Sequence, residues 1–176
     1  MTQKTSNADG ISRLNRLGSE EAARTLFTVC GSRRWVERML ERRPFADSAA
    51  LFGAADEVWF GLERADWLEA FSHHPRIGER NVAQAKFAQT AAQSSREQSG
   101  MAAASEAVRT EFARGNEDYE KRFGHVFLIC ATGKTADEML ANLRERIGNE
   151  PAKELQNAAM QQSQIVRIRL RKLVES

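Results

Sequence analysis

Only residues 126–131 of this chain read as a β-strand, and one short strand cannot build a sheet. Elsewhere the apolar residues recur at the three- and four-residue spacing of amphipathic helices. Periodicity does not separate a strand from a buried connector, so both interpretations of residues 126–131 stay open. The sequence therefore predicts an all-α fold, a single-domain bundle of about eight helices with a long C-terminal helix, no significant sheet and no internal repeat.

Helix caps and helix breakers divide the chain into segments. A small polar residue followed three positions later by glutamate is a typical helix start. The expected starts are Ser19, Ser32, Asp66 with Glu69, a position near Arg96, and Thr135 with Glu138. The expected stops are Gly31, Arg43-Pro44, Gly124 and Gly148-Asn149. Pro151 suits the first turn of a final helix ending near Val174.

Composition limits the class of protein. A chain of 176 residues is about one domain long, and its 26 basic and 24 acidic residues nearly cancel, so no nucleic-acid or membrane partner is expected. Cys30 and Cys130 form neither a disulfide framework nor a metal-ligand spacing, which is typical of a reducing compartment. Residues 1–10 are polar and are expected to be a disordered leader, with residues 11–176 as the domain. We expect a cytoplasmic protein.

Several common catalytic motifs are incomplete or missing. Residues 132–135 follow the strand-like run as a phosphate loop would, but the glycine needed five residues before Gly133 is replaced by Leu128. The three histidines lack metal-ligand spacing, and no Gly-x-Ser-x-Gly elbow is present. Cys130 lies in an apolar run and is expected to be a small buried hydrophobic residue.

His74-Pro75 follows an amphipathic helix directly. Proline disfavours helical geometry in the preceding residue, so His74 is expected in an extended conformation at a helix end. Its imidazole titrates near neutrality, which suits proton transfer. His73 is a rival, but only His74 precedes the proline. A structural and a chemical role for His74 are both open on these grounds.

The segment Ser94-Ser95-Arg96-Glu97-Gln98 has two interpretations. Ser94 and Glu97 have the spacing of a capping box at the start of a helix. The same helix start would present backbone N–H groups and side-chain oxygens to a polar or anionic ligand.

Arg169 falls within the apolar face of the final helix, whereas Arg167 and Arg171 point away from it. A guanidinium is rarely buried without a partner, because burial of an unpaired charge is costly. Arg169 is therefore either part of a structural ion pair, a side chain that reaches out to solvent, or a clamp for an anionic ligand. A nucleic-acid surface is disfavoured because the basic residues of this helix do not share one face.

A series of short motifs occurs in a specific order and spacing. They are Cys30-Gly31-Ser32-Arg33-Arg34-Trp35, Arg43-Pro44-Phe45, His74-Pro75-Arg76-Ile77-Gly78, Ser94-x-x-Glu97-Gln98-x-Gly100, Asn116-x-x-Tyr119, Arg122-Phe123-Gly124-His125-x-Phe127-x-Ile129-Cys130-Ala131 and Ile165-x-x-Ile168-Arg169-Leu170. In these motifs the chain resembles the 2-oxo-4-hydroxy-4-carboxy-5-ureidoimidazoline (OHCU) decarboxylase family of urate catabolism, from about Ile11 to Leu173. The resemblance implies an all-helical fold.

It also implies an activity, the conversion of OHCU to (S)-allantoin and carbon dioxide without metal or organic cofactor. The family's site residues fall on His74, Glu97 and Arg169 as catalytic residues, and on Pro75, Ser94, Ser95, Arg96, Gln98, Phe127, Leu128, Ile129, Cys130 and Ala131 as substrate-binding residues. Exposed N–H groups of residues 127–131 would stabilise an enolate, and His74 would protonate it on one face. A homodimer, and urate oxidase and hydroxyisourate hydrolase as pathway neighbours, are implied too. The alternative is a helical binding module of the same fold without catalysis.

Overall fold

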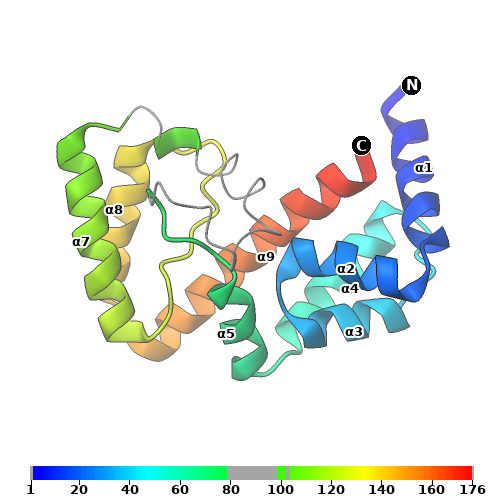
Figure 1. The fold of residues 1–176 in the computed structure, drawn as a ribbon, viewed down its shortest axis with the longest axis horizontal. Coiled ribbons are helices and arrows are strands. Elements are labelled where there is room, and N and C mark those ends of the chain that lie inside the picture. Colours follow the sequence, from blue (N-terminus) through cyan, green and yellow to red (C-terminus); the bar gives the residue numbers. More distant parts are fainter. Residues whose placement is uncertain (1, 79–98, 102–103, 176) are drawn as a thin grey trace. The chain divides into compact units, whose positions relative to one another are not determined.

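The structure is a computed structural model that describes residues 2–78, 99–101 and 104–175. Over these residues the regular structure is helical and contains no strand, which confirms the all-α prediction (Figure 1). Contacts group the chain into two compact units, residues 1–70 with 163–176, and residues 71–162. None of the described helices is long and apolar enough to cross a membrane.

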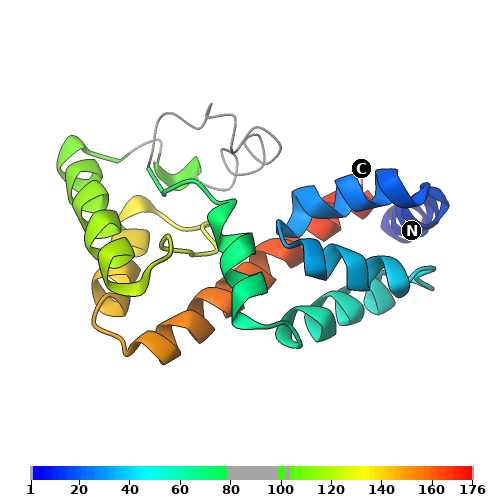
Figure 2. The ribbon, with the colours of Figure 1, turned by 60° about the horizontal axis from the view of Figure 1, so that its bottom comes forward.

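The first unit is built from helices near the N-terminus and the end of the chain. It contains α1 (Thr2–Arg16), α2 (Ser19–Cys30), α3 (Arg33–Glu41), α4 (Ser48–Phe60), most of α5 (Arg64–Ser72) and the C-terminal half of α9 (Pro151–Glu175). α2 packs against α3, and α4 packs against both α1 and α3 (Figures 1 and 2). Buried Trp35 anchors this core, and its Nε1 donates to the Ala55 carbonyl at 3.1 Å.

α1 covers residues for which the sequence predicts a disordered leader, since the helix begins at Thr2. Gly10 lies where α1 approaches the end of α9. A Cβ at this position would lie 1.9 Å from the carbonyl oxygen of Val174, so a larger residue would push the two backbones apart. Glycine therefore permits the close contact between α1 and α9.

The second unit contains residues 73–78 and 126–131, the two irregular segments that carry predicted site residues. It contains the end of α5, the short 3-10 helix η2 (Ser99–Met101), α7 (Glu106–Phe123), α8 (Ala136–Arg146) and the first half of α9. α7 and α8 lie side by side (Figure 1). Their packing is close at Gly115, where a Cβ would come within 2.7 Å of Leu143 Cδ2.

Most helix boundaries follow the local signals. Ser32 accepts a hydrogen bond from the Trp35 N–H at the start of α3, and Thr135 with Glu138 forms the predicted capping box of α8. Gly31 and Gly124 end α2 and α7 with φ of 81° and 75°, a conformation that favours glycine. Pro151 is the first residue of α9, as predicted.

α2 begins at Ser19 as predicted, but its predicted cap is wrong, and two other predicted helix starts differ from the structure. Gly18 is the N-cap of α2, and the Ser19 side chain makes no capping hydrogen bond. α5 begins three residues earlier than expected, because Asp66 accepts from the Glu63 N–H and so belongs to its first turn. α7 begins at Glu106 rather than near Arg96, because Ser105 supplies its cap by accepting from the Val108 N–H.

Residues 126–131 form an extended connector and not a strand. Phe127, Leu128, Ile129 and Ala131 are buried, whereas Cys130 is half-buried, which corrects the prediction that Cys130 is a buried residue. Phe127, Ile129 and Ala131 belong to the apolar cluster of this unit, and Cys130 is not part of it. The segment after the connector is a tight turn with Gly133 at φ 80°, closed by a hydrogen bond from the Lys134 N–H to the Ala131 carbonyl.

Candidate functional site

His74 lies just beyond the end of α5, as the His-Pro sequence predicts. α5 ends at Ser72, and the His74 N–H donates to the Phe71 carbonyl at 3.1 Å, which closes the last turn. The side chain of His74 is buried, with 7% of its surface exposed, and Pro75 is buried beside it, whereas His73 is half-buried. The hydrogen bond to Phe71 and the burial of the side chain therefore fix the position of His74 at the end of α5.

Helix α7 fastens the residues that follow His74. Asn116 Nδ2 donates to the Ile77 carbonyl at 3.0 Å. One helical turn further along, Glu120 forms two hydrogen bonds with Arg76, at 2.7 and 2.9 Å. Gly78 ends the fastened segment with a φ of 82°, in the region that favours glycine.

The connector of residues 126–131 is fastened from α8 and α9. Arg146 Nη1 donates to the Leu128 carbonyl at 2.7 Å, and the guanidinium lies over the Phe127 ring at 4.7 Å from its centroid. The Cys130 N–H donates to Gln161 Oε1 at 2.8 Å. The Cys130 N–H is therefore already bonded, which corrects the expectation that the N–H groups of the connector are open to a ligand.

Two other N–H groups of the connector remain available to a ligand. Leu128 and Ile129 are buried, and within the described part of the chain their N–H groups make no hydrogen bond. Buried backbone donors normally have a partner. These two groups are consequently the better candidates for contact with a bound ligand.

A buried polar network lies behind the connector. Glu154 is fully buried and accepts from Arg146 at 2.6 and 2.9 Å, from the Tyr119 hydroxyl at 2.5 Å and from Asn149 at 2.7 Å. Burial alone would raise the pKa of Glu154, but the hydrogen bonds from Arg146, Tyr119 and Asn149 outweigh it and hold the pKa below its usual 4.5. Burial and the bond to Glu154 raise the pKa of Tyr119, so its hydroxyl stays protonated.

Sequence reasoning did not find this network. Glu154 stands in the first turn of α9, where an acidic residue is typical of an exposed helix start. Arg146 ends α8 just before Gly148, a place where a basic residue is equally ordinary. The sequence shows Tyr119 only as part of the Asn-x-x-Tyr motif, and the 35 residues that separate it from Glu154 hide their contact.

A chain of aromatic rings joins the His74 segment to the connector. Phe71, three residues before His74, lies 5.2 Å from the His125 ring, and His125 lies 5.5 Å from Tyr119. Tyr119 in turn lies 5.2 Å from Phe127 in the connector. The second unit thus brings together two of the predicted site segments.

Arg169 belongs to the first unit and is buried, with 3% of its surface exposed, which confirms its place on the inner face of α9. Its Nη1 donates to the Val29 carbonyl near the end of α2 at 3.1 Å. Arg167, by contrast, is exposed and pairs with Asp56 at 3.1 Å. The remaining predicted residues, Ser94, Ser95, Arg96, Glu97 and Gln98, lie outside the described residues.

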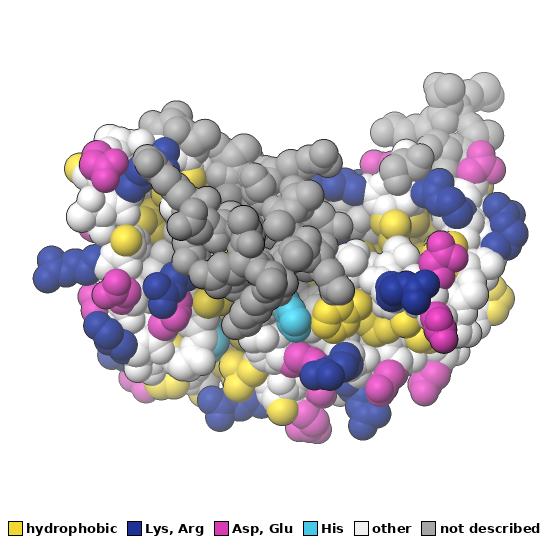
Figure 3. Space-filling view, viewed as in Figure 1, with side chains coloured by type: hydrophobic (Ala, Val, Ile, Leu, Met, Phe, Trp, Pro, Cys, Tyr) yellow, Lys and Arg dark blue, Asp and Glu magenta, His cyan; other side chains and the backbone are white. Residues whose placement is uncertain are grey.

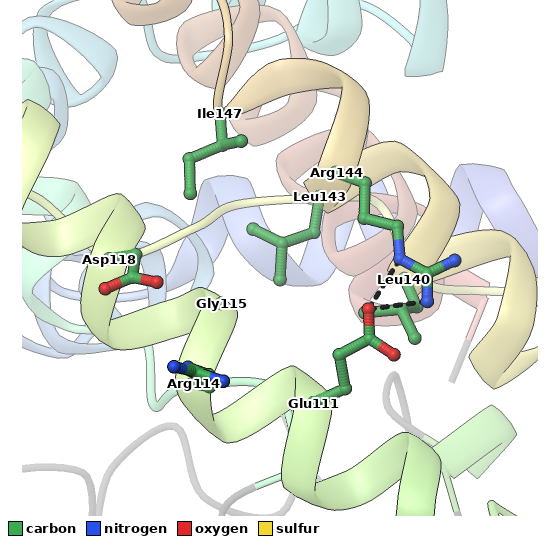
Figure 4. Close-up of a pocket in the computed structure, with 8 residues that line it drawn as sticks. All are labelled: Glu111, Arg114, Gly115, Asp118, Leu140, Leu143, Arg144 and Ile147. Carbon is green, nitrogen blue, oxygen red and sulfur yellow. Dashed lines mark hydrogen bonds and ion pairs between the residues drawn. The ribbon is translucent and has the colours of Figure 1, made fainter.

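Two cavities in the second unit are lined by described residues. The larger, of about 170 Å³, lies between α7 and α8, with Leu140, Leu143 and Ile147 as its apolar wall and charged side chains on its rim (Figure 4). The other, of about 130 Å³, is lined by Arg76, Gly78 and Asn116 among others. On the face shown in Figure 3, basic and acidic side chains are mixed, and no large field of one sign is seen.

The fold and these segments define an all-helical protein with a buried histidine fixed at a helix end and an anchored extended segment near it. Comparison with known families gives a match of residues 15–171 to OHCU decarboxylase. The chain belongs to the OHCU decarboxylase family.

Individual relatives agree with this assignment. The chain is 38% identical over 145 residues to the uric acid degradation bifunctional protein TTL of Arabidopsis thaliana, across 82% of this chain and 44% of that protein. It is 32% identical to a 2-oxo-4-hydroxy-4-carboxy-5-ureidoimidazoline decarboxylase of Amia calva, across 76% of this chain and 75% of the relative. The chain therefore spans less than half of the bifunctional relative and three quarters of the other.

Solved structures share the fold. A crystal structure of OHCU decarboxylase in the presence of (S)-allantoin aligns with a TM-score of 0.73 and 37% identity, covering 85% of this chain and 96% of that one. A crystal structure of (S)-allantoin synthase aligns with a TM-score of 0.70 at 18% identity, which supports the fold alone.

Proposed function

We propose that this chain decarboxylates OHCU to (S)-allantoin and carbon dioxide, as a carboxy-lyase of urate degradation. The observation that carries the proposal is the family match over residues 15–171, joined to a buried His74 at the helix end where the family motif places it. The relative solved in the presence of (S)-allantoin supports the choice of product.

In the proposed reaction the bond between the ring carbon and the carboxylate breaks, and carbon dioxide leaves without the bonding electron pair. That pair moves onto the neighbouring carbonyl to form an enolate. Backbone N–H groups of Leu128 and Ile129 are suited to stabilise the developing negative charge. The His74 imidazolium then transfers its proton to the carbon on one face, which sets the S configuration.

The other predicted residues have supporting roles in this proposal. Glu97 holds the imidazole or the ureido group, and Ser94, Gln98 and Arg169 bind polar edges of the substrate. A cation that gripped the departing carboxylate tightly would stabilise the substrate and oppose the reaction. Arg169 is therefore proposed as an anchor for a group that stays on the product. No metal or organic cofactor takes part.

The cellular setting is proposed on the same grounds. We expect a cytoplasmic homodimer that receives OHCU from urate oxidase and hydroxyisourate hydrolase. Sedimentation equilibrium of the pure chain tests the dimer, because a monomer mass at micromolar concentration contradicts it.

The test of the function supplies OHCU freshly made by urate oxidase and hydroxyisourate hydrolase and follows (S)-allantoin by circular dichroism. We expect the wild-type chain to produce one enantiomer faster than the spontaneous reaction. His74→Asn should lower kcat by about 10²- to 10⁴-fold, the range that general acid catalysis supplies. His73→Asn is the matched control and should stay near the wild-type rate.

Racemic product at the spontaneous rate from the wild-type chain would overturn the function. If the wild-type chain bound (S)-allantoin without turnover, a binding module would be the better description. Near-normal stereoselective turnover by His74→Asn would remove His74 as the acid.

A further inference from the structure

The backbone after α5 carries the proposed acid but has no regular hydrogen bonding of its own. Residues 73–78 lie outside any helix, and glycine at position 78 ends the segment in a left-handed conformation. Side chains of neighbouring elements can supply contacts that fix such a segment. In the second unit α7 supplies two of them.

The first contact is the amide of Asn116. Its Nδ2 donates to the Ile77 carbonyl at 3.0 Å, and only 2% of the Asn116 surface is exposed. Its Oδ1 makes no hydrogen bond within the described part of the chain. A buried amide that bonds at one end contributes little to stability, because the unbonded end carries a desolvation cost. The hydrogen bond to the Ile77 carbonyl therefore explains the buried Asn116 better than a contribution to stability does.

The second contact is the ion pair between Arg76 and Glu120. Two parallel hydrogen bonds, Nε to Oε1 at 2.7 Å and Nη2 to Oε2 at 2.9 Å, fix the plane and the position of the guanidinium. Both side chains keep solvent contact, with 43% and 25% of their surface exposed. A pair of this kind adds about 0–1 kcal/mol to stability, so its geometry matters more than its energy.

We propose that Asn116 and the Arg76–Glu120 pair, which together we call the α7 clamp, are positioning residues for His74. The two contacts hold the residues two and three positions beyond the histidine, and the hydrogen bond from the His74 N–H to Phe71 holds its own backbone. His74 is thereby fastened on both sides. The inference rests on the proposed function of His74 as the acid.

Protonation of the enolate on one face requires a fixed position of the His74 imidazole. A proton delivered to one face of a planar enolate must come from a donor at a defined distance and direction. A displacement of about 1 Å can cost about 10²-fold in rate. When the imidazole moves away, water protonates either face, and the product loses its enantiomeric excess.

The chain offers matched controls for both contacts. Asn142 Nδ2 donates to the Glu138 carbonyl at 2.9 Å within α8, so Asn142→Asp repeats the change of Asn116→Asp away from the segment. Glu111, also on α7, pairs with Arg144 of α8 through Arg144 Nε at 2.6 Å. Glu111→Gln therefore repeats the change of Glu120→Gln on the same helix without touching the His74 segment.

We measure kcat, KM and the enantiomeric excess of allantoin for the two clamp variants, the two controls and wild type, each after a cooperative thermal melt shows it is folded. Asn116→Asp removes the donor and puts a carboxylate against the Ile77 carbonyl, and should lower kcat by about 10- to 100-fold. Glu120→Gln should lower kcat by about 3- to 10-fold, since the new amide oxygen still accepts one hydrogen bond from Arg76 and the Asn116 contact is kept. Both should reduce the enantiomeric excess with little change in KM, and both controls should match wild type.

A second readout is independent of turnover. In protein labelled with ¹⁵N-histidine, the His74 ring signals are identified by their loss in His74→Asn. They should shift or broaden in both clamp variants and stay unchanged in both controls. Because the ring signals do not depend on turnover, this measurement tests the clamp even if the wild-type chain proves inactive. If Asn116→Asp does not fold, the result for Glu120→Gln tests the clamp on its own.

Wild-type activity with unchanged kcat, enantiomeric excess and ring signals in folded clamp variants would overturn the α7 clamp and leave the proposed function intact. An inactive wild-type chain would overturn the function alone, provided the His74 ring signals still respond to the clamp variants. A loss of melting temperature without change in enantiomeric excess or ring signals would show that the clamp is only structural.

Discussion

The His74 segment and the connector of residues 126–131 are both irregular stretches in the second unit, but they are held in different ways. The His74 segment is fastened by one amide and by an ion pair that solvent still reaches. The connector is fastened by Arg146, which is buried together with its fully buried partner Glu154. The ion pair that holds the His74 segment is partly exposed, whereas the ion pair behind the connector lies in the interior.

The two ion pairs are expected to differ in what they contribute, one to the position of His74 and the other to the stability of the fold. An ion pair in contact with solvent is replaced by water at little cost, so its loss changes geometry more than folding free energy. A buried pair that loses one partner leaves an uncompensated charge in the interior, which costs far more. We therefore expect substitutions at the connector network to appear first in unfolding measurements, and substitutions at the α7 clamp to appear first in stereoselectivity.

The largest effect on stability is expected for Arg146→Met. It leaves Glu154 buried without its cation and removes the donor to the Leu128 carbonyl. The unfolding free energy should fall by about 3–5 kcal/mol, measured by urea unfolding followed by far-ultraviolet circular dichroism. Arg144→Met, which breaks the more exposed pair with Glu111, is the control and should cost at most about 1 kcal/mol. Equal losses in the two variants would contradict the distinction between interior and surface.

An intermediate effect is expected from pH, because the pKa of Glu154 is held below its usual value. Glu154 therefore binds a proton more readily in the unfolded chain than in the folded one. The stability contributed by ionised Glu154 is fully present above about pH 4.5. It is lost as the pH falls through the lower pKa of the folded state. The difference in unfolding free energy between wild type and Glu154→Gln should therefore shrink on acidification. Urea titrations between pH 3 and pH 7 measure it on both proteins, and a difference that grows towards low pH would refute the assignment.

Local signals made much of the fold predictable. Thr135 with Glu138, Gly31, Gly124 and Pro151 each act within a single helical turn, and each marks a helix boundary in the structure. At α5 and α7 the first turns are closed by hydrogen bonds other than the predicted ones, from the Glu63 N–H to Asp66 and from the Val108 N–H to Ser105. Helix boundaries are harder to predict from a sequence pattern than the helices themselves.

The site was predictable in part. The proline after His74 and the periodicity of α9 placed His74 and Arg169 at a helix end and on a buried face without reference to any relative. The roles of Glu154 and Arg146 were hidden, because ordinary positions at helix ends become a buried pair only when α7, α8 and α9 pack together. The state of residues 126–131 was hidden for the same reason, since the partners of its backbone, Arg146 and Gln161, come from other elements.

The smallest effect is expected for Thr135→Ala, which sharpens the comparison by destabilising α8 without touching either segment. The Thr135 hydroxyl accepts from the Glu138 N–H, and the Glu138 carboxylate accepts from the Thr135 N–H, which lowers the pKa of Glu138. Loss of the cap should cost about 1 kcal/mol, measured by urea unfolding. Because Arg146 at the far end of α8 keeps its contacts, kcat and enantiomeric excess should stay at wild-type values. If Thr135→Ala instead lowered the enantiomeric excess as the α7 clamp variants do, general loss of stability would explain all three, and the separation of positioning from stability would fail.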